Sequence, residues 1–325
     1  MDTGLKDFSL AIFRFSFNPS EEIWLPPYKG SAFRGVFGSV FKRVVCISSE
    51  KVCKSCLLNF RCVYSYTFET PIDGKVKFNT THLPHPYVIE PPLEEKTLYL
   101  PGEYFSLNLI LIGNAIEYLP YFVFVMERLG ENRIGKRRGR FFLERVENLP
   151  HPSDEKGRII YELKSKRLLA DIEIKKPFET GGELQENNSN TLTLHFLTPT
   201  RITYRNRLCG PLEFNFSVFI KNILRRIALL TYHCGTELQI DYKDLLIQAE
   251  NIQMQESSLY WYDWQRYSTR QNTRMKLGGF KGKVVFKGNI LPFLPFIKCG
   301  EYIHIGKDTS FGLGKYIIEF VEGKQ

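Results

Sequence analysis

The sequence has no run of about 20 apolar residues, the length that a membrane-spanning helix needs. One of its longest apolar runs, Tyr121 to Met126, is far shorter. The N-terminal residues also lack the basic segment and the following apolar stretch of a secretory signal peptide. We therefore expect a soluble, cytoplasmic protein with no membrane partner.

Apolar and aromatic residues, in contrast, are not scarce. Of the 325 residues, 43% are hydrophobic and 14% are aromatic, which excludes a largely disordered basic chain. A chain of this length predicts two domains or one large domain.

Acidic residues are scarce in two segments, and these segments carry the net charge of +9. Residues 131–145 hold six basic and two acidic residues, and residues 266–283 hold six basic residues and no acidic one. Aromatic residues interleave with the basic ones, which favours a nucleic-acid backbone with bases stacked nearby. Two solvated surface loops would also explain the pattern. The candidate contacts are Lys136, Arg137, Arg138 and Arg140 in the first segment, and Arg266, Tyr267, Arg270, Arg274 and Lys276 in the second.

The flanks of the first segment recur near the C-terminus. After Gly130 and again after Gly300, the chain has an Ile-Gly-Lys triplet, a glycine-rich basic loop and a short β-rich stretch. A repeat of this length predicts two copies of one supersecondary unit. The spacing of the second copy does not fit a nucleotide-triphosphate loop. Its glycines and lysines instead suit close approach of the backbone to nucleic-acid phosphates, and they are Gly306, Gly312, Gly314, Lys307 and Lys315.

Each half of the chain predicts the same order of elements. In the first half we expect strands at 8–17, 104–112 and from residue 140, with helices at 29–45 and 116–129. In the second half we expect strands at 191–197, 283–287 and from residue 315, with helices at 211–232 and after Pro292. Both halves follow the ferredoxin-like (RRM-like) β-α-β-(β)-α-β plan. The predicted fold class is α+β, with tandem domains at residues 1–150 and 191–325 and a connecting segment at 151–190.

The predicted helix at 29–45 has an apolar stripe that marks a core face. Its opposite side carries Arg34 together with Gly35 and Gly38. Two glycines inside a helix cost of order 1 kcal/mol each relative to alanine. Either another backbone or a bound nucleic-acid strand is therefore expected to approach this side closely.

Four of the seven cysteines, Cys46, Cys53, Cys56 and Cys62, lie within one short insertion at residues 46–62. Because an intracellular chain keeps its thiols reduced, a set of disulfides is not expected. Four thiolates with a central Cys-x2-Cys fit a tetrahedral Zn2+ ion and also a [4Fe–4S] cluster, with free thiols as the remaining alternative. Four cysteine ligands leave no coordination position for a substrate, so we interpret the site as structural.

Three segments resemble a known family. The run from Leu25 to Gly35 and the loop from His304 to Tyr316 are similar to the signatures of the RAMP superfamily of CRISPR-associated proteins. The stretch from Trp261 to Gln271 resembles the branch of endoribonucleases that process precursor CRISPR RNA. The resemblance implies two ferredoxin-like domains, binding of CRISPR repeat RNA, contacts with other CRISPR effector subunits, and a cleavage that needs no metal. Such enzymes leave a 2′,3′-cyclic phosphate and a 5′-hydroxyl.

The chain departs from this family at the expected general base, because no histidine precedes His82. His304, at the start of the second glycine-rich loop, is our first candidate for proton transfer, and a structural role is the alternative. We place it on a strand at Glu301 to Ile305. Lys307 follows it, and the resemblance puts Tyr28, Lys29 and Lys42 near the expected site. The missing histidine keeps open a second reading, a RAMP subunit that binds guide RNA without cutting it.

Overall fold

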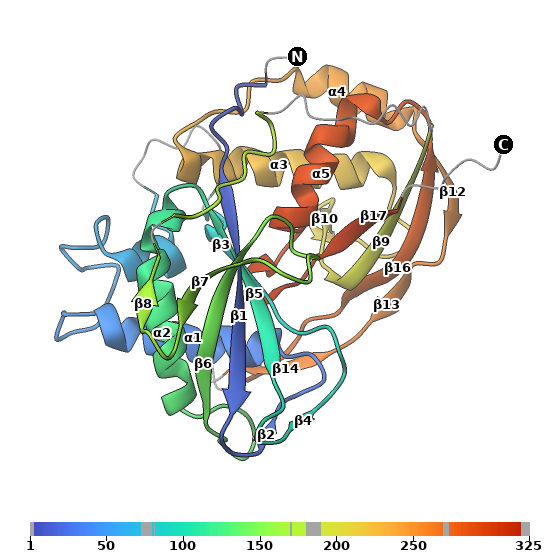
Figure 1. Ribbon diagram of the computed structural model, residues 1–325. Coiled ribbons are helices and arrows are strands. Elements are labelled where there is room, and N and C mark those ends of the chain that lie inside the picture. The colour runs from blue at the N-terminus through green and yellow to red at the C-terminus, as the bar shows by residue number, and fades with distance from the viewer. Residues whose placement is uncertain are drawn as a thin grey trace. The chain divides into compact units, whose positions relative to one another are not determined.

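The computed structural model of the chain describes residues 3–72, 80, 82–169, 171–179, 190–268 and 273–319, with the backbone alone at 265–268 and 273–276 (Figure 1). The chain divides into two compact units. The N-terminal unit comprises Ser9–Lys175 and Tyr232–Gly235, and the C-terminal unit comprises Met1–Phe8, Lys176–Thr231 and Thr236–Gln325. The first domain thus extends beyond residue 150, because two further strands join its sheet. Residues 180–189 of the predicted connecting segment lie outside the described residues.

The N-terminal unit is built on a six-stranded sheet in the order β3-β5-β1-β6-β7-β8. Every strand pair in it is antiparallel. The four strands β3, β5, β1 and β6 have the neighbours of a ferredoxin-like sheet, and the helices α1 (Gly30–Val45) and α2 (Leu119–Glu131) connect them as the sequence predicts. The strands are β1 (Leu10–Pro19), β3 (Tyr87–Glu90), β5 (Phe105–Ile112), β6 (Phe141–Leu149), β7 (Arg158–Glu162) and β8 (Arg167–Leu168).

Aromatic side chains fill the core of this unit. Phe17 of β1 stacks on Phe105 of β5 with ring centroids 5.2 Å apart. Phe37 of α1 stacks on Phe122 of α2 at 5.5 Å, so the apolar stripe of the helix faces the interior as expected. Aromatic pairs of this kind contribute about 0.5–1.5 kcal/mol each beyond the area that they bury.

The C-terminal unit repeats the plan with a sheet in the order β12-β16-β9-β17. Its strands are β9 (Thr191–Thr200), β12 (Gln253–Ser257), β16 (Gly279–Lys287) and β17 (Tyr316–Glu319), and β13 (Tyr260–Tyr262) also pairs with β16. The helices are α3 (Phe216–Cys234), α4 (Tyr242–Glu250) and α5 (Leu294–Ile303). Two independent copies of one strand order confirm the interpretation of the internal repeat.

Two predicted boundaries in this unit are wrong. The helix expected from Pro211 begins at Phe216, because Asn215 Oδ1 accepts a hydrogen bond from Val218 N at 3.0 Å and caps it. The strand expected at Glu301 to Ile305 is instead the last turn of α5, which runs to Ile303.

Short elements complete both units. The N-terminal unit also has β2 (Ile23–Trp24) paired with β4 (Leu98–Tyr99), the π-helical turn η1 (Ser65–Glu69) and the 3-10 turn η2 (Gly113–Tyr118). The C-terminal unit has the hairpins β10 (Thr203–Tyr204) with β11 (Arg207–Leu208) and β14 (Gln265–Ser268) with β15 (Thr273–Lys276), and the 3-10 turns η3 (Leu291–Phe293) and η4 (Thr309–Phe311).

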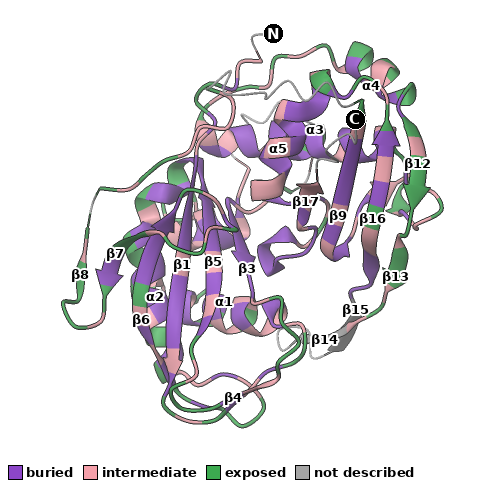
Figure 2. Ribbon diagram, turned by 45° about the vertical axis from the view of Figure 1, so that its right-hand side comes forward, coloured by how far each residue is buried: buried purple, intermediate pink, exposed green. Residues whose placement is uncertain are grey.

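Figure 2 shows that the central strands β1, β5 and β9 are largely buried, whereas β12 is largely exposed. None of the helices in the described part of the chain is both long enough and apolar enough to cross a membrane.

Candidate nucleic-acid interface

The two Ile-Gly-Lys loops make the same contact, each within its own unit. Lys136 N donates to Trp24 O at 3.0 Å, and Lys307 N donates to Arg201 O at 2.9 Å. The preceding glycines have φ values of +81° and +88°, and a Cβ on either would lie 2.1 or 2.5 Å from that carbonyl oxygen. Glycine is therefore required for both the backbone angle and the close approach. The two copies of the Ile-Gly-Lys sequence therefore adopt the same loop geometry.

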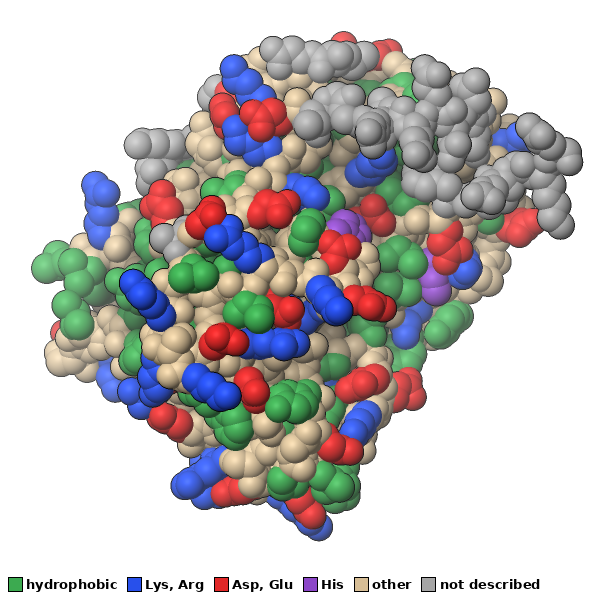
Figure 3. Space-filling model, viewed as in Figure 1, with side chains coloured by type: hydrophobic (Ala, Val, Ile, Leu, Met, Phe, Trp, Pro, Cys, Tyr) green, Lys and Arg blue, Asp and Glu red, His purple; other side chains and the backbone are tan. Residues whose placement is uncertain are grey.

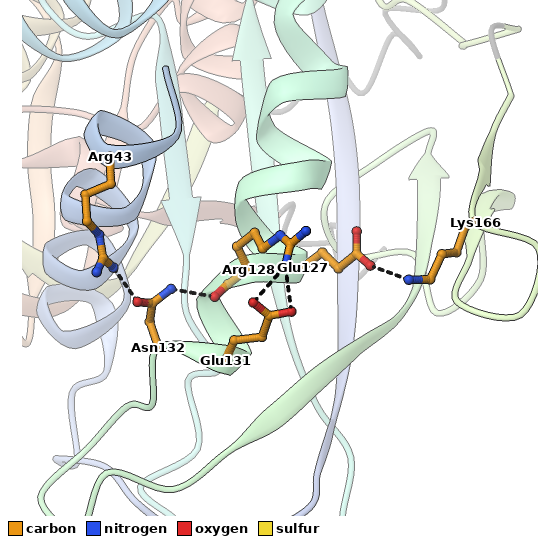
Figure 4. A network of polar contacts seen from close by, with 6 residues as sticks. All are labelled: Arg43, Glu127, Arg128, Glu131, Asn132 and Lys166. Carbon is orange, nitrogen blue, oxygen red and sulfur yellow. Dashed lines mark hydrogen bonds and ion pairs between the residues drawn. The ribbon is translucent and has the colours of Figure 1, made fainter. Parts of the chain in front are cut away.

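A polar network anchors the base of the first loop, residues 132–140 (Figure 4). Asn132 ends α2, and its side-chain amide donates to Arg128 O at 2.7 Å. Asn132 Oδ1 accepts a hydrogen bond from Arg43 of α1. Arg128 also pairs with Glu131 at 3.0 Å, and Lys166 pairs with Glu127 at 3.3 Å. The loop thus begins at a point that is fixed to both helices of the unit.

Three of the five basic side chains of the first loop pair with carboxylates of the same unit. Arg137 lies 3.2 Å from Glu22 and stacks over the Trp24 ring at 4.9 Å. Arg133 and Arg140 lie 3.7 and 3.8 Å from Glu21. Among the described residues, the exposed side chains of Lys136 and Arg138 have no carboxylate partner. Acidic and basic side chains also alternate over the face drawn in Figure 3. Among the predicted contacts of this loop, Lys136 and Arg138 are therefore the two whose charged groups are exposed to solvent and not neutralised by a carboxylate of the described residues.

The second loop, residues 304–315, is fastened to the end of β9. Thr198 Oγ1 donates to Gly312 O at 2.8 Å and accepts from Lys315 N at 2.9 Å. Gly314 N donates to Pro199 O at 3.1 Å. Arg201 pairs with Asp308 at 3.1 Å. These bonds use the backbone groups of Gly312, Gly314 and Lys315 inside the protein, and they leave the Lys307 side chain exposed.

The placement of His304 disagrees with the role predicted for it. The side chain is fully buried, and its Nδ1 lies 3.1 Å from Leu313 O. The residue ends α5 with a φ of +60°, so it supports the turn into the loop. A ring in this position is closed to a substrate, and we assign it the structural role.

Two of the three lysine candidates are also engaged. Lys29 is fully buried, and its ammonium group donates to Pro27 O at 3.2 Å and to Glu94 O. Burial lowers the pKa of Lys29, although Glu94 and Glu95 act in the opposite direction. Lys42 donates to Lys51 O at 2.8 Å and lies over the Tyr64 ring at 5.3 Å. The ammonium groups of both lysines are thus engaged in contacts within the protein. Of the remaining candidates, Tyr28 is half-buried and Lys307 is exposed.

The close neighbours of Gly38 on α1 are side chains of the protein, not another backbone. A Cβ there would lie 3.2 Å from the Phe68 ring and 3.0 Å from the guanidinium of Arg34. That guanidinium stacks over Phe68 at 4.8 Å. Gly35 is different, because nothing lies within 4 Å of its Cβ position and the residue is exposed.

In the second basic segment, residues 266–268 and 273–276 are described as backbone only. Arg266 and Tyr267 lie on β14, and Arg274 and Lys276 lie on β15, so the predicted contacts share one hairpin. Arg270, between these strands, lies outside the described residues.

The four clustered cysteines carry free thiols, and all four line one narrow pocket of the N-terminal unit. Burial raises the pKa of Cys53, and the nearby Lys42 opposes the shift. In the described part of the chain no three His, Cys, Asp or Glu side chains are close enough together to hold a metal ion as they stand.

One polar cluster, around His195, was not anticipated from the sequence. The His195 ring lies half-exposed on β9, and Nδ1 is 3.3 Å from Glu319. Glu319 also pairs with Lys283 at 2.8 Å, and the Lys283 hydrogen bond is the main cause that lowers the pKa of Glu319. A histidine held by a carboxylate at one ring nitrogen is equipped to move a proton at the other. The alternation of apolar and polar residues along β9 could have indicated this cluster, because it places His195 on the face of the strand opposite the core.

Comparison with known families follows the division into two units. Residues 194–316 match the family model of CRISPR-associated endoribonuclease Cas6, and residues 8–172 match the family AF_1859_N, described as an N-terminal domain. The chain belongs to the AF_1859_N family and carries a Cas6 endoribonuclease domain. The predicted resemblance to the CRISPR RNA-processing endoribonucleases is thus confirmed.

Solved Cas6 structures share the fold. Thermus thermophilus Cas6 aligns with a TM-score of 0.54 at 13% identity, covering 96% of this chain and 99% of that one. One chain of a partial Cas6-RT-Cas1–Cas2 complex aligns with a TM-score of 0.56 at 16% identity over 98% of this chain, which spans about half (47%) of that longer chain. An uncharacterised protein of Archaeoglobus fulgidus is 24% identical over 300 residues, covering 90% of this chain and 92% of the relative. The chain therefore has a Cas6-like, two-domain α+β fold.

Proposed function

We propose that this Cas6-domain protein binds CRISPR repeat RNA and cuts the precursor transcript once per repeat. The observation that carries the proposal is the Cas6 domain match together with the duplicated loop, which presents an exposed lysine in each unit. Exposed Lys136 and Lys307 on rigid glycine turns suit a phosphate backbone, whose contacts come mainly from Lys, Arg and backbone N–H groups.

The proposed cleavage is attack by a ribose 2′-oxygen on the adjacent phosphorus. The 2′-hydroxyl loses its proton, the new O–P bond closes a 2′,3′-cyclic phosphate, and the bond to the 5′-oxygen breaks. That oxygen takes up a proton to give a 5′-hydroxyl. Most of the rate can come from positioning and from cations at the phosphate oxygens. Lys307 and Tyr28 are the accessible candidates from the sequence, and the structure adds His195. No cofactor is required for this reaction.

Labelled repeat RNA tests the proposal directly. We expect cleavage to persist in EDTA, and to stop when hydrogen replaces the 2′-hydroxyl at the cleaved position. Tyr28→Phe, Lys307→Gln and His195→Asn should each be compared with Lys243→Gln, an exposed lysine on α4. Cleavage of the deoxy substrate at the normal rate would disprove the mechanism.

The alternative is a subunit that binds guide RNA without cutting it, alongside other CRISPR effector proteins. The buried His304 and the lack of histidine on α1 favour it. The same assay separates the two functions, because a binding subunit shifts the labelled RNA in a gel while leaving its length unchanged.

A further inference from the structure

We propose that residues 46–62 form a small lobe that is held together by one Zn2+ ion bound to Cys46, Cys53, Cys56 and Cys62. The structure supplies two independent observations. All four thiols line a single pocket, although they are spread over the whole lobe. The lobe also lacks an interior of its own.

In this lobe the apolar side chains are exposed and the cysteines are more buried, which is the reverse of an ordinary apolar core. Its apolar residues face solvent, with exposed fractions of 85% for Ile47, 52% for Val52, 103% for Leu57 and 59% for Phe60. Each of the four cysteines is more buried than these apolar residues. Residues 46–62 contain no helix and no strand. So small a segment without an apolar interior needs a cross-link or a metal to hold one conformation.

Backbone hydrogen bonds place each cysteine at a fixed point. Cys46 ends α1, where its N–H donates to Lys42 O at 2.9 Å. Cys56 N donates to Cys53 O at 3.2 Å, which closes the Cys-x2-Cys segment into a turn. Cys62 N donates to Leu58 O at 2.7 Å. Backbone hydrogen bonds thus anchor the chain at three points around the pocket that the four cysteines line.

Zinc is the metal that this donor set suits best. Four thiolates match tetrahedral Zn2+ and leave no position for substrate, so the site is structural. A [4Fe–4S] cluster also takes four cysteines, and the metal and sulfide content of the protein distinguishes it from zinc. The ammonium group of Lys42, bonded to Lys51 O at 2.8 Å, offsets part of the negative charge of a zinc tetrathiolate.

The test is the metal content of the full-length protein, purified without chelator and without air. We expect one zinc per chain, and we expect Cys53→Ser with Cys56→Ser to lose it. Cys209→Ser, which alters a buried cysteine of the C-terminal unit, should retain it. Iron and sulfide in place of zinc, or zinc that survives the double substitution, would overturn the assignment.

A second measurement separates metal loss from misfolding. Cobalt added to the chelator-treated wild-type protein should give the absorption of tetrahedral thiolate-bound Co2+, and zinc should displace it. We also expect zinc to protect four thiols from alkylation and to slow proteolysis within residues 46–62. No cobalt spectrum, with unchanged alkylation and proteolysis, would contradict the proposal whether or not the protein cleaves RNA.

Discussion

Glu301 on α5 is a carboxyl group packed against β17, where its Oε1 accepts a hydrogen bond from Ile318 N at 2.8 Å. Burial raises its pKa from 4.5 to about 7, while the Ile318 hydrogen bond acts in the opposite direction. Between these two pH values the folded protein binds more protons than the unfolded chain. The free energy of unfolding therefore falls as the pH rises through this window.

Glu301→Gln should remove this pH dependence, because the amide oxygen can still accept the bond from Ile318. At about pH 8 we expect the free energy of unfolding of the variant to exceed that of the wild type by about 1–3 kcal/mol. At about pH 5 we expect a much smaller difference. Urea unfolding at both pH values measures the difference. Glu256→Gln, at an exposed position of β12, is the matched control. An equal effect of Glu301→Gln at both pH values would show that burial does not control the titration.

A comparison of Gly135 with Gly102 distinguishes the energetic cost of a positive φ from the cost of a steric clash with a neighbouring carbonyl. Their φ values are +81° and +85°, but a Cβ would lie 2.1 Å from Trp24 O at Gly135, and nothing lies within 4 Å at Gly102. Both alanine variants pay about 1 kcal/mol for the backbone angle. Gly135→Ala should cost about 2 kcal/mol more, since a carbonyl must also move. Urea unfolding checks this, and equal losses would contradict the close approach.

At the scale of single elements, the first basic loop carries two kinds of cation. Lys136 and Arg138 are exposed, whereas Arg133 and Arg137 are paired with Glu21 and Glu22. Replacing Lys136 and Arg138 by glutamine should lower the slope of log affinity against log salt by about 1.4, because each phosphate contact on single-stranded RNA contributes about 0.7. Replacing Arg133 and Arg137 should change the slope by less. Fluorescence anisotropy with a non-cleavable deoxy-substituted repeat measures both.

The elements that the sequence predicted are those with a periodic pattern. The aromatic alternation of β1 and the apolar stripe of α1 gave both correctly within two residues. The strand β3 was missed because all four of its residues are buried, which leaves no alternation to read. β12 was missed for the opposite reason, since it is an edge strand made mostly of exposed polar residues.

The candidate site was less predictable because tertiary contacts decide which charged groups are accessible. The motif that contains His304 was identified, but its burial depends on packing within the C-terminal unit. Glu22 and Arg137 are far apart in the sequence, so nothing local indicated that the acid would neutralise the arginine. The sequence predicted which residue types gather at the loops, and the fold determined which of them face solvent.

At the scale of the whole molecule, the duplicated loops pose the question of whether both units hold the same RNA. A strand that meets about six phosphate contacts should give a salt slope near −4 for the intact protein. Lys307→Gln removes one cation from the loop of the C-terminal unit and should lower the slope by about 0.7. Because the loops belong to separate units, the decreases in salt slope caused by substitutions in each loop should add if one RNA strand contacts both loops.

The decisive variant combines Lys136→Gln, Arg138→Gln and Lys307→Gln. We expect its slope to be about 2.1 smaller than that of the wild type, measured by anisotropy between about 50 and 200 mM salt. Replacing the exposed Lys156, Lys164 and Lys243 instead controls for the general loss of charge. A triple variant no weaker than the N-terminal double variant would show that the C-terminal loop does not contact the RNA. The repeat would then record common descent of the two units and not a shared binding track.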